Sequence, residues 1–503
     1  MTDPLPREYT PRTVPALLRK RAADLGDRPA VSGRDGAGYR TLSYTELDTA
    51  SSRLAGGLLA AGVAAPGAPV AWAIGNDHGI AGLVLYHAVL KAGAVNVPMS
   101  PRLSPVEVAG LLDHCGAETL VVAGDAAPVP GVRTVAVAEL AEHAGPGPAH
   151  RADEIDLAAV LYTSGTTGLP KGVEHTHASS LAAGIAWADC FRLTGDDVLQ
   201  SPFPVVSGAG LHFNAMSCLW AGGHVVVDEP VLPGCLERIE QFGATVYVAV
   251  PSIYQYWLAY DGLADHDLGS LRLLDYGGAS MATSVIERLS ERLPGVGFMQ
   301  TYGFTEAGPG GTYLPAEYTR HRPGSIGARA AGRASRFRVV DDAGREVVAG
   351  VPGELQFRGP SVMRGYHRDP EATASVFVDG WIRSGDIVRF DDEGFLYFVD
   401  RRRELIVRGG YNIAPAEIEH ALLRHPDVLE AAVFGVSHEA LGEVPVAAVV
   451  LRPGAPATEL SIVEYCRTVL ADFKAPRVVR LVDELPKNAA GKTLKNVLRE
   501  SLA

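Results

Sequence analysis

The chain has 503 residues, a length that suggests two or three domains. Of these residues 47% are hydrophobic and 20% are charged, which is ordinary for a globular protein. Its formal net charge of −13 argues against broad binding of nucleic acids, because such binding needs a basic face that neutralises many phosphates. Any polyanionic ligand must therefore be held by local donors.

The cysteines and the N-terminus predict a cytoplasmic protein. Five cysteines are scattered without a Cys-x-x-Cys pair, a pattern that fits a reducing compartment and predicts neither a disulfide framework nor a zinc site. Residues 1–12 contain acids and prolines where a signal peptide has an apolar core. The most hydrophobic window, Ile80 to Met99, is interrupted by His87 and Lys91, so we expect no membrane span.

Helical and strand patterns alternate in the N-terminal part of the chain. Helical periodicity covers Tyr44 to Ala61, Gly79 to Ala92 and Pro105 to Cys115. Strand-like runs cover Pro69 to Ile74 and Thr119 to Val122. This alternation predicts α/β layers with largely parallel strands.

The stretch Y-T-S-G-T-T-G-L-P-K-G, residues 162–172, combines hydroxyls, glycines and a lysine. It follows an apolar run, Leu157 to Leu161, that predicts a buried strand, and it precedes a helical pattern from His177 to Cys190. Glycine lets the backbone approach a ligand closely, and the hydroxyl and ammonium groups add donors. A strand, this loop and a helix start together predict a phosphate site.

Two later strand-like runs also end in loops suited to a ligand. Leu271 to Asp275 is followed by Tyr276-Gly277-Gly278-Ala279, and Gly297 to Gln300 by Thr301-Tyr302-Gly303-Phe304-Thr305-Glu306. Open α/β sheets bind ligands at the carboxyl ends of their strands. We therefore expect both loops to face a ligand.

The remaining chain predicts a change of architecture. Short strands and glycine turns from Gly324 to Val399 indicate a small β-rich subdomain. The charged run Asp400 to Glu404 is the expected domain boundary. Helices at Pro415 to Leu423 and Glu459 to Leu470, with strands near them, predict a compact α+β domain. We expect a domain at 1–400, a hinge at 401–403 and a second domain at 404–503.

Gly491-Lys492-Thr493 ends like a Walker A motif, which raises the possibility of a P-loop NTPase. That motif requires a glycine five residues before Gly491, where this chain has Pro486. The loop at 163–172 also lacks the Walker spacing. The phosphate chemistry must therefore come from another arrangement.

Taken in order, the motifs resemble those of the adenylate-forming superfamily, which includes acyl-CoA synthetases, luciferases and peptide-synthetase adenylation domains. They are Tyr162 to Gly172, Tyr302 to Glu306, Ser384 to Asp386, Asp400-Arg401, Arg408 to Asn412, and Pro486 to Lys492. The resemblance covers essentially the whole chain. It implies a large N-terminal domain of layered α/β sheets with a small β-rich subdomain, followed by a small mobile α+β C-terminal domain.

The superfamily's chemistry implies ATP, Mg²⁺ and coenzyme A. Attack of a carboxylate on the α-phosphorus of ATP forms an acyl-adenylate and pyrophosphate, and a thiol then displaces AMP. Charge develops on the phosphoryl oxygens, so the reaction needs fixed donors and a metal ion.

The resemblance implies a role for each motif, although alone Tyr302 could be a core aromatic and Lys492 a surface lysine. Tyr302 would face the adenine, Glu306 would coordinate Mg²⁺ as a hard cation, and Asp386 would accept the ribose hydroxyls. Arg401 and Lys171 would support catalysis, and Lys492 would bridge the carboxylate and the α-phosphate. The further nucleotide-binding residues would be Thr163, Ser164, Gly165, Thr166, Thr167, Gly168, Gly277, Gly278, Ala279, Gly303 and Thr305.

In the same resemblance, the C-terminal domain rotates between the two half-reactions. The hinge corresponds to Arg403, where the family more often has Asp or Lys. Gly409, Gly410 and Tyr411 would line the path of the pantetheine arm, and a tight turn before the helix at Pro415 is compatible with that role.

The acid pocket is where the chain departs from the family pattern. Many members carry an aromatic or histidine gate at about the position of Ser207. The implied pocket residues are Ser207, Gly208, Leu211, Gly278 and Gly303. Small side chains there predict room for a bulky apolar or aromatic acid.

Three functions are compatible with these residues. The preferred one is a carboxylic acid:CoA ligase that acts on a small-molecule acid without nucleic acid. The alternatives are an enzyme that loads the acyl group onto a carrier protein's pantetheine arm, and a non-catalytic nucleotide-binding scaffold.

Overall fold

The computed structural model describes residues 3–36, 38–124, 129–143, 145, 147, 150–163, 171–279, 281–401, 404, 406–408, 411–413, 415–438, 442–470, 474–487 and 493–502, with the backbone alone at 400, 401, 407, 411, 412 and 442. The chain divides into two compact units. The first extends to Phe337 and includes Phe357–Ile382, and the second combines Arg338–Gln356 with the chain from Arg383 onward. Asp400 lies inside the second unit, and both the domain boundary at 400 and the hinge at 401–403 stay predictions.

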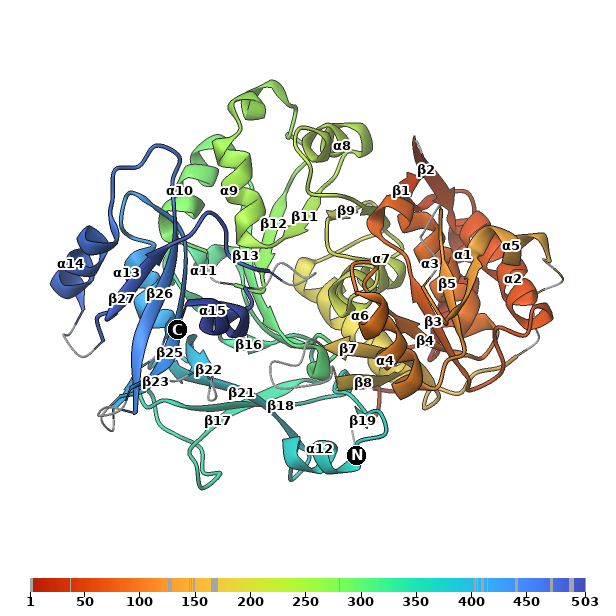
Figure 1. Ribbon diagram of the computed structural model, residues 1–503. Coiled ribbons are helices and arrows are strands. Elements are labelled where there is room, and N and C mark those ends of the chain that lie inside the picture. The colour runs from red at the N-terminus through yellow and green to blue at the C-terminus, as the bar shows by residue number, and fades with distance from the viewer. Residues whose placement is uncertain are drawn as a thin grey trace. The chain divides into compact units, whose positions relative to one another are not determined.

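A nine-stranded sheet carries several of the loops identified in the sequence (Figure 1). Its strands follow the order β16-β14-β13-β12-β11-β9-β10-β1-β2. Neighbours from β13 to β1 pair in parallel, so their carboxyl ends meet at one edge. The bounds are β1 Pro29–Asp35, β2 Gly38–Ser43, β9 Val198–Ser201, β10 His224–Val227, β11 Val246–Ala249, β12 Leu273–Gly277, β13 Gly297–Gly303, β14 Gly311–Leu314 and β16 Arg329–Ala330.

A seven-stranded sheet in the same unit follows the order β19-β8-β7-β4-β3-β5-β6. The strands from β7 to β6 are parallel, and β8 and β19 add antiparallel neighbours at one side. The bounds are β3 Pro69–Ala73, β4 Val95–Pro98, β5 Thr119–Val122, β6 Arg133–Ala136, β7 Leu157–Thr163, β8 Lys171–Thr176 and β19 Gly365–Tyr366. The predicted α/β layers with largely parallel strands are confirmed.

Helix α3 (Gly79–Lys91) links these sheets, because it contacts β1 of the first and β4 of the second. Every residue of α3 except Ala81 is buried. A helix that is apolar on all sides belongs in a core, which explains the hydrophobic window around Ile80. None of the described helices is long and apolar enough to cross a lipid bilayer.

The other helices of this unit cover the sheets and connect their strands. Residues of α8, α9 and α10 form a separate core cluster with β11, β12 and β13. The bounds are α1 Val14–Leu25, α2 Tyr44–Ala60, α4 Pro105–Cys115, α5 Val137–Glu142, α6 His177–Phe191, α7 Met216–Ala221, α8 Gly234–Phe242, α9 Pro251–Ala259, α10 Thr283–Arg292, α11 Ala316–Thr319 and α12 Pro370–Val376. Short helical turns and strands lie at η1 Asn76–His78, the π-helix η2 Ala209–Ala215, η3 Asp261–Asp265, η4 Thr305–Ala307, β15 Ser325–Gly327 and β20 Phe377–Val378.

The β-rich region contains the strand order β22-β21-β18-β17. Strands β17 (Arg336–Val340) and β18 (Gly353–Arg358) lie within the stretch expected to be rich in strands. The sequence did not predict β21 (Trp381–Phe390), which pairs antiparallel with β22 (Leu396–Arg401).

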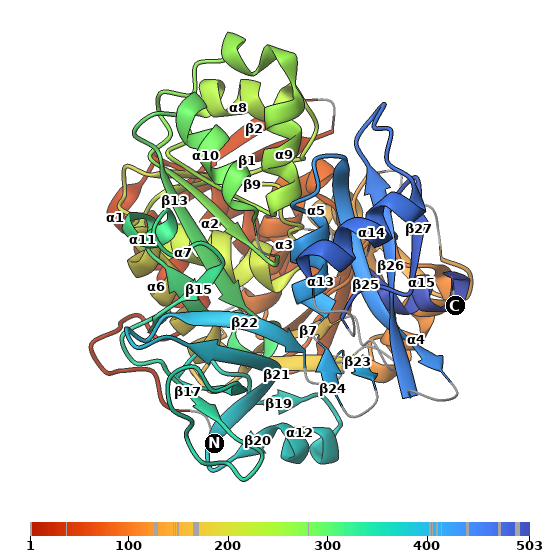
Figure 2. The same cartoon turned by 90° about the vertical axis from the view of Figure 1, so that its left-hand side faces the viewer.

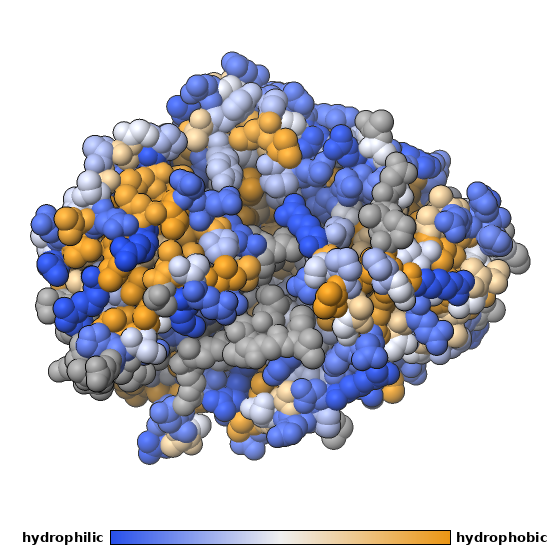
Figure 3. Space-filling model, in the orientation of Figure 1, coloured by the Kyte–Doolittle hydropathy of each residue, from blue (hydrophilic) through white to orange (hydrophobic). Residues whose placement is uncertain are grey.

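The C-terminal part of the second unit is the expected α+β structure. Its sheet follows the order β24-β23-β26-β25, and β27 pairs with β26. Helices α13 and α14 pack on one face and α15 on the other (Figure 1 and Figure 2). Hydrophobic residues gather where these elements reach the surface, on the left of Figure 3. The bounds are β23 Ile406–Arg408, β24 Tyr411–Ile413, β25 Val428–His438, β26 Gly442–Leu451, β27 Val478–Leu481, α13 Pro415–Leu422, α14 Glu459–Val469 and α15 Lys495–Leu502.

Candidate active site

The expected phosphate-binding stretch joins two antiparallel strands. Strand β7 ends at Thr163 and β8 begins at Lys171, and these two residues are paired. Residues 164–170, which include Ser164, Gly165, Thr166, Thr167 and Gly168, lie outside the described residues. The predicted helix from His177 is confirmed as α6, and a strand that was not predicted, β8, separates it from the stretch.

Strands β12 and β13 bring the two predicted nucleotide loops together. They are parallel neighbours, and Gly277 is the partner of Thr301. A Cβ on Gly277 would lie 2.6 Å from Thr301 Oγ1, so close strand packing requires glycine there. Gly278 has φ +75°, and Ala279 beside it is exposed. These residues therefore share one sheet edge with the end of β13.

The end of β13 leads to the acidic residue predicted to bind metal. Tyr302 stacks on Phe357 with ring centroids 6.3 Å apart, and Gly303 packs closely against Pro309. Thr305 and Glu306 form the short turn η4. Glu306 Oε1 accepts a hydrogen bond of 2.9 Å from the Tyr366 hydroxyl, a contact that the sequence did not predict.

Glu306 fits the way in which Mg²⁺ is held beside a nucleotide. Mg²⁺ commonly takes one or two protein carboxylates and completes its coordination with phosphates and water. Within the described part of the chain, no group of three or more His, Cys, Asp or Glu residues could form an all-protein metal site. A single carboxylate is consistent with a site in which Mg²⁺ is shared between one protein carboxylate and the phosphates of a nucleotide.

The predicted acid-pocket residues reach this edge through η2. A Cβ on Gly208 would lie 3.3 Å from Leu161 Cδ1 and 3.9 Å from Thr305 Cγ2. Gly208 thus lies against both β7 and the η4 turn. Ser207 Oγ donates to Pro204 O at 2.7 Å and accepts from Gly210 N at 3.0 Å, which fixes the start of η2. Leu211 is fully buried.

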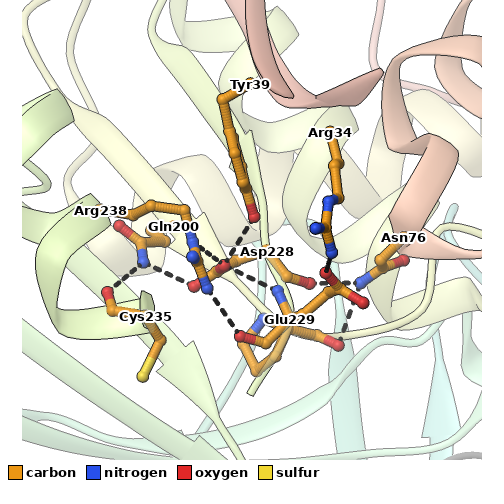
Figure 4. Close-up of polar contacts among 9 residues, drawn as sticks. Arg34, Tyr39, Asn76, Gln200, Asp228, Glu229, Cys235 and Arg238 are labelled. Atoms are coloured by element: carbon orange, nitrogen blue, oxygen red, sulfur yellow. Dashed lines mark hydrogen bonds and ion pairs between the residues drawn. The ribbon is translucent and has the colours of Figure 1, made fainter. Parts of the chain in front are cut away.

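A cluster of polar residues holds the segment that leads to Ser207 (Figure 4). Asn76 Nδ2 donates to Pro202 O and Phe203 O, each at 3.2 Å, and to Asp228 O at 2.7 Å. Its Oδ1 accepts from Val205 N at 2.9 Å. Asn76 therefore fastens the segment that leads to Ser207 to the end of β10.

Asp228 is the centre of the cluster in Figure 4. Its side chain accepts hydrogen bonds from Gln200 Nε2 at 2.7 Å and from the Tyr39 hydroxyl at 3.2 Å, and it forms an ion pair with Arg238. Burial raises the pKa of Asp228, and the Arg238 guanidinium opposes that rise. The sequence did not predict Asn76 or Asp228, because no local motif marks contacts between such distant segments.

Two buried histidines lie beneath the η4 turn. His175 Nε2 donates to Thr305 O at 2.9 Å, and its ring lies edge-to-face with His212 at 5.2 Å. Burial lowers the pKa of His175 to about 4 and that of His212 well below its usual value. Both rings are therefore neutral near pH 7, with His175 acting as a hydrogen-bonding group and His212 packing against it.

In the second unit the structure pairs two of the predicted residues. Asp386 on β21 is buried and is the partner of Arg401 on β22. The Asp386 N–H donates to Ser384 Oγ at 3.1 Å, and Ser384 Oγ donates to Leu355 O at 2.6 Å. These bonds hold strand β21 around Gly385, which has φ +74°.

The remaining predicted residues are described in part. Tyr411 begins β24 and pairs with Arg408 at the end of β23, so the two glycines between them connect the strands. Gly409, Gly410, Arg403 and Lys492 lie outside the described residues. Their roles stay predictions.

Comparisons with known proteins cover nearly the whole chain. The model of AMP-binding enzymes matches residues 18–367, and the model of the AMP-binding enzyme C-terminal domain matches residues 417–492. The 3-[(3aS,4S,7aS)-7a-methyl-1,5-dioxo-octahydro-1H-inden-4-yl]propanoyl:CoA ligase of Mycobacterium tuberculosis is 35% identical over 97% of this chain and 99% of its own. A feruloyl-CoA synthase of an Amycolatopsis species is 35% identical over 92% of this chain and 94% of its own.

A solved structure agrees with these matches. The o-succinylbenzoate coenzyme A synthetase of Bacillus subtilis, in complex with ATP and magnesium ion, superposes with a TM-score of 0.86 at 30% identity. The match covers 95% of this chain and 98% of that one. The chain belongs to the AMP-binding enzymes, the adenylate-forming superfamily that its motifs resemble.

Proposed function

We propose that the protein is an ATP- and Mg²⁺-dependent carboxylic acid:CoA ligase that forms AMP. The observation that carries this proposal is the shared sheet edge at the ends of β12 and β13, in a chain whose full-length relatives are named as CoA ligases. That edge gathers Gly277 to Ala279, Tyr302, Thr305 and Glu306. The non-catalytic scaffold loses its support, because these relatives are enzymes.

The reaction proceeds in two balanced steps. A carboxylate oxygen of the acid attacks the α-phosphorus of ATP, and pyrophosphate leaves. The CoA thiolate then attacks the acyl carbon, and AMP leaves with the oxygen that joined it to the acid. The first step replaces oxide, a poor leaving group on the acyl carbon, with AMP, a better one, and the second step uses that leaving group to form the thioester. The protein's contribution is to hold donors where charge develops.

Each predicted residue receives one task in these steps. The hairpin from Thr163 to Lys171 binds the outer phosphates, and Tyr302 with Gly277 to Ala279 binds the adenine. Glu306 supplies the carboxylate for Mg²⁺, which neutralises phosphate charge when bound. Asp386 and Arg401 bind the ribose and the α-phosphate, and Lys492 joins the carboxylate to the α-phosphate. The paired strand positions of Asp386 and Arg401 support their joint role.

Domain rotation separates the two steps in this proposal. The C-terminal domain turns about Arg403, and Gly409 to Tyr411 then line the path of the CoA thiol. The compartment is the cytoplasm, and five unpaired, buried cysteines are consistent with its reducing conditions.

The acid is bulky and apolar or aromatic. Small residues at Ser207 and Gly208 support this substrate class, and so do the names of relatives, which include a feruloyl-CoA synthase, a 4-coumarate–CoA ligase and an indoleacetate–CoA ligase. Pyrophosphate release across aryl, fatty, alicyclic and terpenoid acids tests this class. A preference for acetate or propionate would contradict it.

Free CoA is the preferred acceptor because the relatives are CoA ligases. A carrier protein presents the same thiol arm, so both acceptors are compared with one acid. Faster transfer to a carrier-bound arm than to free CoA would favour the carrier-loading alternative.

A further inference from the structure

We propose that Tyr366 is a positioning residue that links the phosphate-binding hairpin to Glu306 and sets the affinity for the Mg²⁺–ATP complex. This inference rests on the proposed function. Tyr366 lies outside the motifs that carry the superfamily resemblance in this chain, and only its contacts indicate a role.

The backbone around Tyr366 is fastened to the strand that begins at Lys171. In the β8–β19 pairing, Tyr366 is the partner of Val173 and Gly365 that of Glu174. His367 N donates to Gly172 O at 2.7 Å. Tyr366 therefore moves with the end of the phosphate-binding hairpin.

The side chain of Tyr366 contacts both functional groups. Its hydroxyl donates to Glu306 Oε1 at 2.9 Å, and Lys171 Nζ lies 4.7 Å from the centre of its ring. The backbone of Glu306 is held as well, because its carbonyl accepts from Met363 N at 2.8 Å. One residue thus spans the phosphate-binding lysine and the metal-binding carboxylate.

Among the described residues, Tyr366 provides side-chain contacts to both Glu306 and Lys171. Glu306 sits in a three-residue turn, and a lysine loses substantial rotamer entropy when it is ordered. The hydroxyl fixes one carboxylate oxygen and leaves the other for the metal. The ring face holds the ammonium by a cation–π interaction. Both side chains are ordered before the ligand arrives, which lowers the cost of binding.

The hydroxyl and the ring can be tested separately. Tyr366→Phe keeps the ring and removes the hydroxyl, and Tyr366→Leu removes both. Calorimetry of ATP binding without acid or CoA, once with Mg²⁺ and once with EDTA, provides the readout. We expect Tyr366→Phe to weaken Mg²⁺–ATP binding on the order of tenfold, the scale of one hydrogen bond to a charged group, and to leave ATP binding in EDTA unchanged. We expect Tyr366→Leu to weaken ATP binding about threefold more than Tyr366→Phe does, both with Mg²⁺ and with EDTA, because it also removes the ring that holds Lys171.

Tyr397 offers a matched control. Its hydroxyl donates to Asp391 Oδ2 at 3.2 Å, and the Arg389 guanidinium lies 5.6 Å from its ring centre. Tyr397→Phe therefore removes the same kind of contact from a carboxylate other than Glu306. It should bind ATP like the unmodified protein in both conditions.

A second comparison tests whether the hydroxyl acts through Glu306. Glu306→Gln should weaken Mg²⁺–ATP binding, and adding Tyr366→Phe to it should weaken binding no further, because the two groups act as a unit. Additive losses would overturn the inference, as would equal losses for Tyr366→Phe with Mg²⁺ and with EDTA. If the unmodified protein gained no ATP affinity from Mg²⁺, the proposed function itself would fail. If it gained that affinity and Tyr366→Phe kept it, the inference alone would fail.

Discussion

At the scale of single residues, Asn76 shows how the acid-pocket segment is held from a distance. Its carboxamide nitrogen donates to the carbonyl oxygens of Pro202, Phe203 and Asp228, and its carboxamide oxygen accepts from the Val205 N–H. A carboxamide carries two N–H donors and one carbonyl acceptor on the same group, which is the combination that these contacts require. The position of Ser207 and Gly208 therefore depends on a residue far from them in sequence.

We predict that Asn76→Ala raises the KM for the acid by about tenfold, since it removes hydrogen bonds worth ~1.4 kcal/mol in net terms. The KM for ATP should not change. Asn76→Asp should raise the KM for the acid at least as much, because a carboxylate oxygen would replace the N–H donors and face the carbonyl oxygens that they bind. Steady-state kinetics with the best acid of the panel measures both constants, and an equal rise in the two KM values would argue against a local role.

At the scale of elements, the π-helix η2 depends on close backbone packing at its start. A Cβ on Gly210 would overlap the carbonyl oxygen of Pro204. Only glycine allows the chain to pass there while Ser207 caps the turn. The shape of the acid-pocket segment is thus set by the absence of a side chain.

Gly210→Ala should lower the free energy of unfolding by about 1–3 kcal/mol, the usual cost of overpacking. Gly110, inside α4, provides the control because nothing lies within 4 Å of its added Cβ. Gly110→Ala should raise stability by ~0.5–1 kcal/mol through helix propensity and chain entropy. Urea denaturation compares the two variants, and a harmless Gly210→Ala would refute the packing argument.

Elements also show where sequence reasoning succeeds. Helix α4 has the predicted bounds, because Pro105 suits a first turn and Gly116 adopts the left-handed conformation that ends the helix. Strand β8 was not predicted, since Lys171 to Thr176 is short and partly polar, and its pairing with β7 and β19 makes it a strand. Local sequence signals predicted the elements that have clear start and stop residues. Elements that form only by pairing with distant strands were not predicted.

The same limit applies to the site. Glycine-rich and acidic loops identified the ends of β12 and β13, because the chemistry of phosphate and metal binding leaves local patterns. Tyr366 and Asn76 leave none, since their importance lies in contacts with Glu306 and with the segment at 202–205. Such residues become visible only when distant strands are placed side by side.

At the scale of the whole molecule, buried histidines couple stability to pH. Burial lowers the pKa of His87 to about 3 and those of His175, His177 and His224 to about 4. In the unfolded chain these pKa values return to ~6.5, so the unfolded state binds more protons as the pH falls. The stability that the neutral rings provide is complete above pH ~6.5 and is lost progressively below it.

We predict a lower urea midpoint at pH 5.5 than at pH 7.5, with a loss of about 1.4 kcal/mol for each such histidine. His177→Gln should reduce by one the number of protons taken up on unfolding, so the free energy of unfolding should depend less steeply on pH. A midpoint that is the same at both pH values would show that these rings are not held neutral.

The central claim is that the carboxylate oxygen of the acid attacks the α-phosphorus of ATP. The most direct test supplies an acid of the preferred class labelled with ¹⁸O in its carboxylate, together with ATP, Mg²⁺ and CoA, and analyses the products by mass spectrometry. The account predicts acyl-CoA, unlabelled pyrophosphate and AMP that carries one ¹⁸O atom. Formation of ADP with ¹⁸O in inorganic phosphate, or acyl-CoA formation with unlabelled AMP, would contradict it.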